Sequence, residues 1–335
     1  MRRWVLKQGV TGMDGLVEET VDIPEPQQGE VRMRVRAVSL NRRDQLVMAG
    51  ALGRLPDRDV VPLSDGAGEI DAVGPGVTDW QVGDRVASLF FANWVSGPAN
   101  PEIGAGLGAF HEDGMLAEYV VLPAERVVAM PEGYDFEEAA TLPCAGVTAW
   151  NAVRSGHPID ETSKVLVMGS GGVSLFSLLF ARTAGAQVIA TTGHDAKADD
   201  IRKLGASEVI NYRENAEWGA QVLQATGGVD KIVELGGLGT MAQSLMAVGF
   251  GGEIALVGML AGPAEGLDVM LLHGKGANIR GVAVGSLDMY RDMKAAIEAN
   301  DIRPPIYKRF GVDDIKSAYE TLDAPDLFGK IVVTL

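Results

Sequence analysis

The sequence predicts an α/β protein that combines a Rossmann doubly wound parallel sheet with a partly open antiparallel β-barrel. Three observations support this fold class. Apolar and charged residues alternate before about residue 126, strand and helix patterns alternate after Pro131, and a glycine turn joins a strand to a helix at 169–174. We expect a β-barrel at 1–126, a doubly wound domain at 127–285 and a separate tail segment at 286–335.

Composition narrows the class of protein. A chain of 335 residues is long enough for two domains, and its formal net charge of -16 opposes binding to nucleic acid or to an anionic membrane surface. The single cysteine, Cys144, excludes an internal disulfide and fits a reducing cytosol. The first ten residues lack the apolar segment of a signal peptide, and glycines interrupt the uncharged stretch Leu235–Gly252. We therefore expect a cytoplasmic protein with neither a nucleic-acid nor a membrane partner.

The barrel part is predicted from period-two patterns. In Glu30–Val38, residues 31, 33, 35 and 37 form an apolar face opposite a charged one. Further strands are expected at Glu69–Val73, Asp84–Phe91 and Met115–Leu122. The segment Asn93–Asp113 is rich in Gly, Pro and Asn, and we expect it to be a loop over a cleft.

The nucleotide-binding part is predicted from alternating strands and helices. Asp135 is a suitable N-cap for a helix with Glu137 and Glu138 in its first turn. The six expected strands are Val165–Met168, Gln187–Thr191, Glu208–Asn211, Lys231–Leu235, Glu253–Val257 and Ile279–Val284. The tail is expected to form helices near Met289–Ala299 and Val312–Leu322, followed by a strand at Lys330–Leu335.

The glycine turn predicts a dinucleotide site. Backbone N–H groups in such a turn face a phosphate, and the helix N-terminus adds a partial positive charge. The expected cofactor contacts are Gly169, Ser170, Gly171, Gly172, Val173 and Ser174. Ser174 takes the place of the third glycine, where a small residue is needed for packing. The alternative is an ordinary strand-to-helix turn without a ligand.

The residues after the second expected strand favour NADP(H) over NAD. Thr192 stands where an NAD site usually has an acidic residue, so it removes repulsion against a 2′-phosphate and its hydroxyl can donate to one. Lys197 falls in the first turn of the next helix, where a cation opposes the helix dipole, and a bound phosphate would explain it. The alternative for Lys197 is a solvated surface lysine. Asp195 is more simply the N-cap of that helix.

The chain resembles the medium-chain dehydrogenase/reductase superfamily over nearly its whole length. The motifs that carry the resemblance are Val38-Ser39-Leu40-Asn41, Asp65-Gly66-Ala67-Gly68, Gly83-Asp84-Arg85-Val86, Asp113-Gly114-Met115-Leu116-Ala117-Glu118-Tyr119 and Phe328-Gly329-Lys330. The chain is most similar to the zinc-free branch, which includes quinone and enone reductases and zinc-type alcohol dehydrogenase-like proteins. The resemblance implies that the barrel at 1–126 is a GroES-like catalytic domain, that residues 127–285 bind the dinucleotide, and that the return segment at 286–335 completes the catalytic domain. It also implies a homodimer formed by pairing of the last strand of the nucleotide domain.

The resemblance also indicates where a catalytic metal would be held in zinc alcohol dehydrogenases. The corresponding positions are Asn41, Ser64 and Cys144, of which only the thiol is a usual zinc ligand, and the four-cysteine lobe is missing. An unusual site from Asp65, His111 and Cys144 lacks metal-ligand spacing. We therefore expect no metal. Asp65 and Cys144 are expected in the substrate pocket; the alternatives are a turn cap for Asp65 and a buried small hydrophobe for Cys144.

Further cofactor contacts are implied by the matched motifs. The resemblance places Arg42 at a pyrophosphate-binding arginine, Thr148 near the nicotinamide, Tyr212 over the adenosine phosphate, and Val257, Gly258 and Met259 beside the nicotinamide. Three of these residues have simpler alternatives. Arg42 is then a surface arginine, Thr148 a helix residue bonded to its own backbone, and Tyr212 a rim aromatic.

The resulting hypothesis is hydride transfer from NADPH to a quinone or an α,β-unsaturated carbonyl compound. The developing charge on the carbonyl oxygen needs a donor, and the side-chain amide of Asn41 is the best candidate. The alternative for Asn41 is a turn residue that orders the loop at 40–43. Two other functions stay open, namely an alcohol dehydrogenase and a non-catalytic NADPH-binding protein.

Overall fold

The chain forms two units in the computed structural model, which describes residues 1–53, 55–91, 93–262, 264 and 266–335. The first unit comprises Met1–Ala145 and Ser286–Leu335, and the second comprises Gly146–Gly285. The return segment begins where the sequence placed it. The first boundary lies at 145 instead of 126, because the intervening segment pairs and packs within the first unit.

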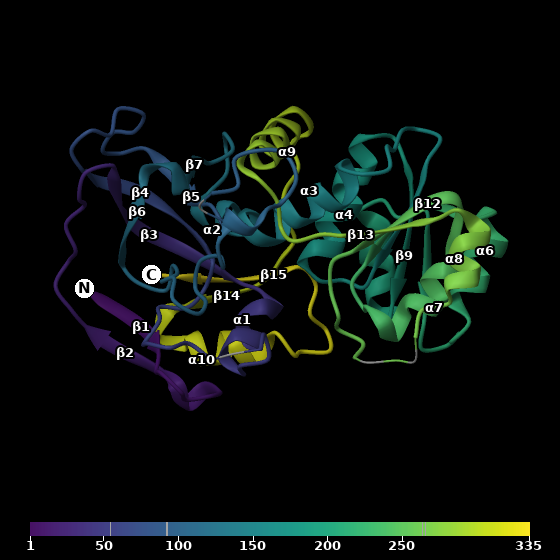
Figure 1. The fold of residues 1–335 in the computed structure, drawn as a ribbon, viewed down its shortest axis with the longest axis horizontal. Helices are drawn as coiled ribbons and strands as arrows, with labels where there is room; N and C mark the ends of the chain where they lie inside the picture. Colours follow the sequence, from purple (N-terminus) through teal and green to yellow (C-terminus); the bar gives the residue numbers. More distant parts are fainter. Residues whose placement is uncertain (54, 92, 263, 265) are drawn as a thin grey trace. The chain divides into compact units, whose positions relative to one another are not determined.

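The first unit is built around a mixed sheet. Its strands are β1 Arg2–Leu6, β2 Leu16–Thr20, β3 Glu30–Leu40, β4 Asp65–Val73, β5 Arg85–Ser88, β6 Tyr119–Pro123, β7 Val127–Ala129, β14 Ile306–Gly311 and β15 Lys330–Thr334. Its helices are α1 Arg42–Met48, α2 Phe136–Ala140, α9 Leu287–Asn300 and α10 Ile315–Thr321. The strand order is β14-β15-β3-β4-β5-β7, with β6 also paired to β3. In Figure 1 the yellow strand β15 lies beside β3, so the last strand borders the central one.

Strand β3 shows why the sequence forms this sheet. Val31, Met33 and Val35 are buried, while Arg32 and Arg36 on the other face pair with carboxylates of β4. The strand is antiparallel to β4, β6 and β15. β14 is parallel to β15 and was not expected from the sequence. The predicted loop at 93–113 contains one short 3₁₀ turn, and Leu107 in it is buried.

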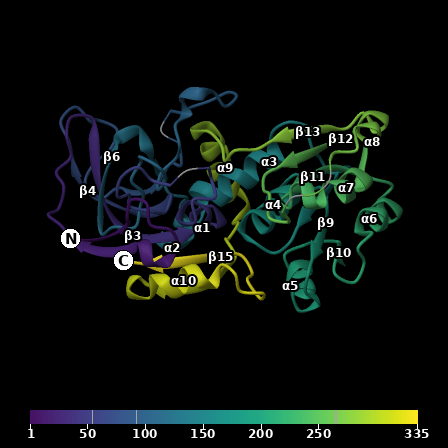
Figure 2. The ribbon, with the colours of Figure 1, turned by 60° about the horizontal axis from the view of Figure 1, so that its bottom comes forward.

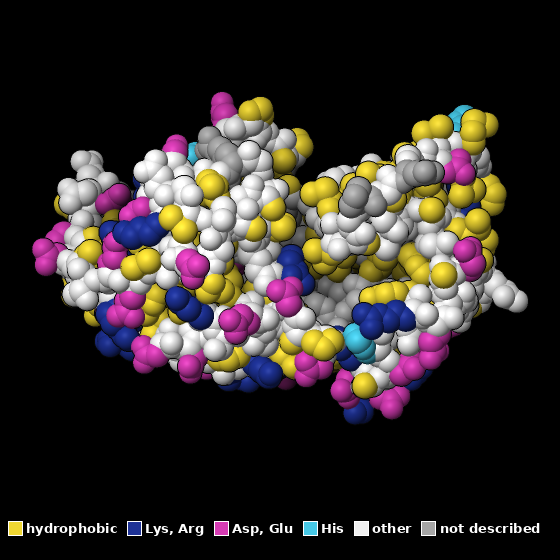
Figure 3. All heavy atoms as spheres, turned by 90° about the horizontal axis from the view of Figure 1, so that it is seen from below, with side chains coloured by type: hydrophobic (Ala, Val, Ile, Leu, Met, Phe, Trp, Pro, Cys, Tyr) yellow, Lys and Arg dark blue, Asp and Glu magenta, His cyan; other side chains and the backbone are white. Residues whose placement is uncertain are grey.

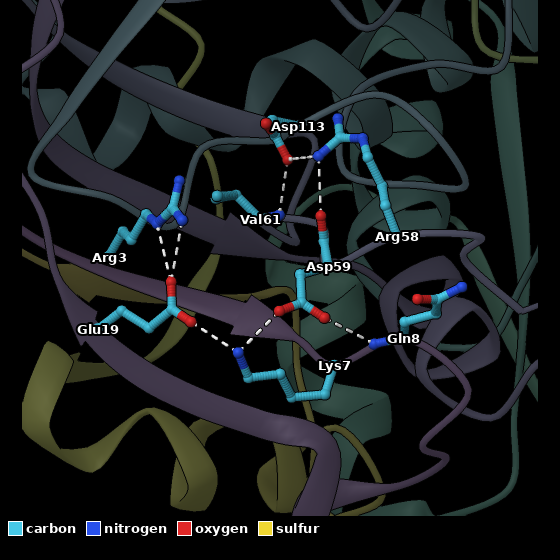
Figure 4. A network of polar contacts seen from close by, with 8 residues as sticks. All are labelled: Arg3, Lys7, Gln8, Glu19, Arg58, Asp59, Val61 and Asp113. Carbon is cyan, nitrogen blue, oxygen red and sulfur yellow. Dashed lines mark hydrogen bonds and ion pairs between the residues drawn. The ribbon is translucent and has the colours of Figure 1, made fainter.

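Charged side chains anchor the N-terminal hairpin of β1 and β2 (Figure 4). Glu19 accepts hydrogen bonds from Arg3 and Lys7, and Lys7 also contacts Asp59 at 2.7 Å. These bonds lower the pKa of the Glu19 and Asp59 carboxyl groups. The network continues through Gln8, Arg58, Val61 and Asp113. Individual exposed pairs stabilise little, but this network links the hairpin to two distant loops.

The second unit contains the predicted parallel sheet. Its strands are β8 Lys164–Met168, β9 Gln187–Thr192, β10 Glu208–Asn211, β11 Val229–Glu234, β12 Val248–Leu256 and β13 Asn278–Gly281, in the order β10-β9-β8-β11-β12-β13. Its helices are α3 Val147–Arg154, α4 Gly172–Thr183, α5 Ala198–Lys203, α6 Trp218–Thr226, α7 Leu238–Ala247 and α8 Val269–Lys275. All six predicted strands are present. The order reverses beside β8, and ligands bind at such a switch point in doubly wound sheets.

Helices cover both faces of this sheet. Helix α3 packs against α4, and α6 packs against α7. Figures 1 and 2 show the two pairs on opposite sides of the strands. The inner strands are therefore buried on both faces, which explains the uninterrupted apolar residues Val165–Met168 in β8 and Val188–Ala190 in β9.

Two surface properties of the described residues bear on partners. None of their helices combines the length and apolar composition that crossing a bilayer requires. On the face shown in Figure 3, Lys and Arg side chains are scattered among Asp and Glu. This distribution agrees with the strongly negative net charge, while the absence of a nucleic-acid partner stays a prediction.

Candidate functional site

The glycine turn after β8 has the backbone of an anion-binding site. Gly169 has a φ of +79°, which favours glycine, and its N–H donates to the Thr191 carbonyl at 2.9 Å. Gly171 is the N-cap of α4 with a φ of −78°, and a Cβ added to it would meet no protein atom within 4 Å. Neither backbone strain nor protein crowding therefore requires glycine at 171. Open space over a helix N-terminus is what a bound phosphate needs.

The first turn of α4 supplies the donors. The first intrahelical bond at this end runs from Leu175 N–H to the Gly171 carbonyl at 3.0 Å. The N–H groups of Gly172, Val173 and Ser174 precede that bond, so they have no intrahelical acceptor. The turn thus presents three backbone N–H donors at the start of α4, and their contact with a dinucleotide pyrophosphate stays a prediction.

Ser174 stabilises the turn through its side chain. The hydroxyl is fully buried and donates to the Gly169 carbonyl at 2.7 Å. The side chain therefore closes the turn internally, and only the backbone N–H of Ser174 is left for a phosphate.

Thr192 lies at the end of β9. It is buried, and its hydroxyl exchanges hydrogen bonds with the backbone of His194, at 3.2 Å in each direction. Donation from this hydroxyl to a 2′-phosphate stays a prediction. The uncharged character of this position is unaffected.

Lys197 lies next to the glycine turn. Its Nζ donates to Ser170 Oγ at 3.0 Å. Lys197 is the last residue of the 3₁₀ turn Asp195–Lys197, which precedes α5. The side chain is half-buried, so it is not a freely solvated surface lysine. The N-cap of this 3₁₀ turn is His194 rather than the predicted Asp195, whose carboxylate instead accepts from Asn211 at 2.8 Å.

A second cation near β9 was missed from the sequence. A Cβ added to Gly193 would lie 2.6 Å from the Tyr212 hydroxyl and 3.2 Å from Arg213 Nε. Because Gly193 has no side chain, both residues can lie across the end of β9. Tyr212 is 42% exposed, in keeping with either role considered for it. The place of Arg213, directly after the third predicted strand, is the signal that could have identified it.

The loop after β12 is held by β11. The N–H groups of Val257 and Gly258 donate to the Glu234 carbonyl at 2.9 and 3.1 Å, and Met259 is 78% exposed. The buried Glu234 carboxylate also accepts from backbone and hydroxyl donors in the loop after β11 and in α7. Thr148 is buried in the first turn of α3. The nicotinamide contacts of Thr148 and of residues 257–259 stay predictions.

The first unit holds a separate buried polar cluster. Asn41 Nδ2 donates to Asp65 Oδ2 at 2.9 Å, and Ser64 Oγ donates to Asp65 Oδ1 at 2.7 Å. Lys330 Nζ donates to Asn41 Oδ1 at 2.5 Å and lies 3.7 Å from Asp65 Oδ2. Asp65 is completely buried and Lys330 is 3% exposed. Asn41 is 9% exposed and is thus a buried member of this cluster.

Electrostatics in the cluster follow from burial. Burial raises the pKa of Asp65, while the Lys330 charge and the hydrogen bonds from Asn41 and Ser64 oppose that rise. The backbone of Cys144 also bonds to Asp65. Burial raises the pKa of the Cys144 thiol, which keeps this thiol neutral at physiological pH. The structure therefore brings the predicted residues Asn41, Asp65 and Cys144 together, and adds Lys330.

The capping box at the start of α1 connects this cluster to the helix. The Asn41 N–H donates to Asp44 Oδ2 at 2.7 Å, and burial raises the pKa of Asp44 to about 6. Asn41 thus orders the loop at 40–43, which is the simpler role that the sequence left open. Nδ2 carries a second hydrogen besides the one that it donates to Asp65, and the predicted role of this amide as a donor to substrate stays a prediction.

The two arginines of α1 have different environments. Arg42 is half-exposed and pairs with Asp323 at 2.5 Å, beside a surface pocket of about 360 Å³ between α1 and α10. Arg43 is more enclosed, with its guanidinium 4.6 Å from the Phe90 ring centroid and 3.6 Å from Asp44. The pyrophosphate role of Arg42 stays a prediction. In this structure its guanidinium is bound to carboxylate and amide groups of its own unit.

The donor groups of the cluster are unlike a zinc site. Among the residues that the structure describes, no three His, Cys, Asp or Glu side chains are grouped so that they could hold a metal. The positions expected for metal ligands present an amide, a hydroxyl and a neutral thiol, and zinc is held by imidazole, carboxylate or thiolate. The charge beside Asn41 is the ammonium of Lys330.

Two family models match the chain. Residues 27–132 match the alcohol dehydrogenase GroES-like domain, and residues 172–299 match the zinc-binding dehydrogenase family. Each match falls in the unit where the sequence predicted that domain, although the second extends past residue 285 into the return segment.

Individual relatives cover nearly the whole chain. A zinc-type alcohol dehydrogenase-like protein of Schizosaccharomyces pombe is 39% identical and spans 99% of both chains. A quinone oxidoreductase of Pseudomonas aeruginosa is 33% identical over 92% of both chains. The crystal structure of an NAD-dependent alcohol dehydrogenase is 30% identical, covers both chains completely and superposes with a TM-score of 0.91.

Proposed function

The chain belongs to the medium-chain dehydrogenase/reductase superfamily, and on this basis we propose that it is a zinc-independent, NADPH-dependent reductase of quinones or α,β-unsaturated carbonyl compounds. The family is one of oxidoreductases that use a nicotinamide cofactor. The finer assignment depends on the two clusters described above. The glycine turn supports cofactor binding, and the Asn41–Asp65–Lys330 cluster supports reduction without a metal.

One observation carries the zinc-independent assignment. Lys330 Nζ lies 2.5 Å from Asn41 Oδ1, at a position where zinc relatives place a metal ligand. An ammonium in contact with this oxygen opposes a divalent cation there, and the neutral Cys144 thiol is a weak ligand. The residues present therefore do not fit a catalytic zinc, and no step is assigned to a metal.

In the proposed mechanism the chain positions and polarises the substrate. The nicotinamide supplies the hydride when it is bound. The N–H groups at the start of α4 bind the pyrophosphate, and the remaining Nδ2 hydrogen of Asn41 donates to the substrate carbonyl oxygen as negative charge develops there. Protonation by water completes the reduction.

The preference for NADPH is supported by charge at the end of β9. Thr192 leaves this position without a carboxylate, and the Lys197 ammonium and Arg213 guanidinium lie near the glycine turn and Gly193. Cations in this region favour a 2′-phosphate over a hydroxyl. One of the similar structures is an NAD-dependent alcohol dehydrogenase, so the affinities for NADPH and NADH need to be measured side by side.

The test is turnover of the purified protein. NADPH oxidation is followed by absorbance with a panel of quinones and enones, and zinc is measured by elemental analysis. We expect turnover at substoichiometric zinc, and a 10²- to 10³-fold lower kcat for Asn41→Ala, as for loss of an oxyanion donor. Asn300→Ala, a change at an exposed helix end, is the control.

A second function is favoured by the names of two relatives. Zinc-type alcohol dehydrogenase-like proteins and an NAD-dependent alcohol dehydrogenase are similar to this chain, so alcohol oxidation is the alternative. Stoichiometric zinc together with alcohol-dependent reduction of NAD would replace the proposal by this alternative. Tight NADPH binding without turnover on either panel would indicate a non-catalytic binding protein.

A further inference from the structure

Lys330 reaches the Asn41 cluster from the last strand of the chain. Strand β15 pairs antiparallel with β3, and the register sets Ile331 opposite Leu40. Lys330 is the first residue of β15, so its ammonium reaches the end of β3, where it donates to the Leu40 carbonyl at 2.7 Å and to Asn41 Oδ1 at 2.5 Å. The Lys330 ammonium thus has two hydrogen-bond acceptors within 2.7 Å and the Asp65 carboxyl at 3.7 Å.

The chemistry of the neighbours orients the Asn41 amide. An ammonium can only donate, so the amide atom facing Lys330 is the oxygen. The Asp65 carboxyl lies on the other side of the amide, and its Oδ2 accepts a hydrogen bond from the amide nitrogen. Both contacts agree on one orientation of the amide plane. One Nδ2 hydrogen is donated to Asp65, and the second takes part in neither of these two contacts.

We propose that Lys330 is a positioning residue that holds and polarises the Asn41 amide, so that the remaining Nδ2 hydrogen donates to the carbonyl oxygen of a quinone or enone substrate. This inference rests on the proposed function. The Lys330 bond withdraws electron density from Oδ1 and makes the N–H hydrogens more positive, since hydrogen bonds in a chain strengthen one another. Lys330 thus assists the developing oxyanion without touching it.

The polarisation can be measured on the protein without cofactor or substrate. In ¹H–¹⁵N spectra, the side-chain NH₂ of Asn41 is assigned by its disappearance in Asn41→Ser. We expect both protons to lie downfield in the wild type and to move upfield in Lys330→Met, while Lys316→Met, a change at an exposed lysine of α10, leaves them in place. Unchanged shifts in folded Lys330→Met would overturn the proposal.

The kinetic consequence is measured in the active protein. We expect Lys330→Met to lower kcat about tenfold, as for loss of one charge-assisted hydrogen bond, with the NADPH Kd changed less than about twofold. In Asn41→Ser, adding Lys330→Met should lower kcat by less than about twofold, because the lysine acts through the amide. Full additivity of the two changes would contradict this role.

A second set of variants covers loss of folding. If thermal unfolding shows that Lys330→Met does not fold, Lys330→Arg keeps the charge and Lys330→Gln keeps a donor without charge. We expect kcat to decrease from the wild type to Lys330→Arg and further to Lys330→Gln. An equal kcat for Lys330→Gln and the wild type would refute polarisation. A wild type that reduces no acceptor removes the proposed function, and the spectra still decide whether Lys330 polarises Asn41.

Discussion

The Ser174 hydroxyl donates to the Gly169 carbonyl across the glycine turn, at 2.7 Å. We expect Ser174→Ala to lower the free energy of unfolding by about 1 kcal/mol, the net value of one hydrogen bond, and to raise the NADPH Kd less than about threefold, because the backbone donors remain. Urea unfolding and fluorescence titration measure the two quantities.

Ser177 is the matched control for this change. It lies in the same helix and is buried, and its hydroxyl has no hydrogen-bond partner among the described atoms. Ser177→Ala should therefore leave stability unchanged or raise it slightly. A larger loss in Ser177→Ala than in Ser174→Ala would mean that the bond to Gly169 does not stabilise the turn.

Lys197 should determine cofactor preference. We expect Lys197→Met to raise the NADPH Kd at least about tenfold and the NADH Kd less than about twofold, because a charged contact to the 2′-phosphate is lost. Titrations at two salt concentrations measure both, and the NADPH effect should shrink at high salt. Lys203→Met, at an exposed lysine of α5, is the control. An equal increase in Kd for NADPH and NADH would show that Lys197 does not recognise the 2′-phosphate.

A buried lysine in the second unit should make stability depend on alkaline pH. Lys231 is completely buried against the Val153 and Ser155 carbonyls and lies 3.4 Å from Glu253, and burial lowers its pKa to about 8. Between pH 8 and 10.5 the unfolded chain binds this proton and the folded chain does not, so stability rises with pH in that window.

The comparison with Lys231→Met isolates this titration from other groups. Urea unfolding at pH 7.5, 8.5 and 9.5 should show that the free energy of unfolding of the wild type increases relative to that of the variant as pH increases. Parallel pH profiles for the two proteins would show that Lys231 titrates normally. Lys164→Met is a suitable control, because Lys164 bonds a carbonyl near the surface of the same sheet.

The edge strand β13 should form the dimer contact that the sequence predicts. Its one strand partner among the described residues is β12, and the Val282 N–H donates to the Leu256 carbonyl. Successive N–H groups of a strand point in opposite directions, so that of Gly281 points away from β12. We expect Gly281→Pro to convert a dimer to a 35.4 kDa monomer in light scattering, with the unfolding midpoint preserved. A dimer that survives this change would exclude pairing through β13.

The glycine turn was predictable because its information is local. A buried apolar run, the glycines and a helix-period segment are contiguous from Lys164 to Thr183, and each residue constrains its neighbours. β14 was missed because Ile306–Gly311 is half-exposed and has little alternation, so it forms a strand only through β15.

The Asn41 cluster was only partly predictable for a different reason. The residues that meet there are far apart in sequence: Lys330 and Asn41 are separated by 289 positions. Their contact depends on the register between β15 and β3, which no local pattern specifies. The Phe328-Gly329-Lys330 motif identified the lysine as notable but not its neighbour. The bond from the Thr192 hydroxyl to the His194 carbonyl was not predictable, because it depends on the exact course of the following turn.

The order in which the two clusters appear during synthesis follows from the place of β15. The glycine turn and its whole sheet are encoded before residue 286, so a growing chain can complete that sheet while its first unit still lacks its last strand. Asp65 and Asn41 are translated early, whereas Lys330, which contacts them, is added near the end of synthesis. A chain that stops before residue 330 would therefore retain the glycine turn, while Asp65 in the other unit would lack its lysine neighbour.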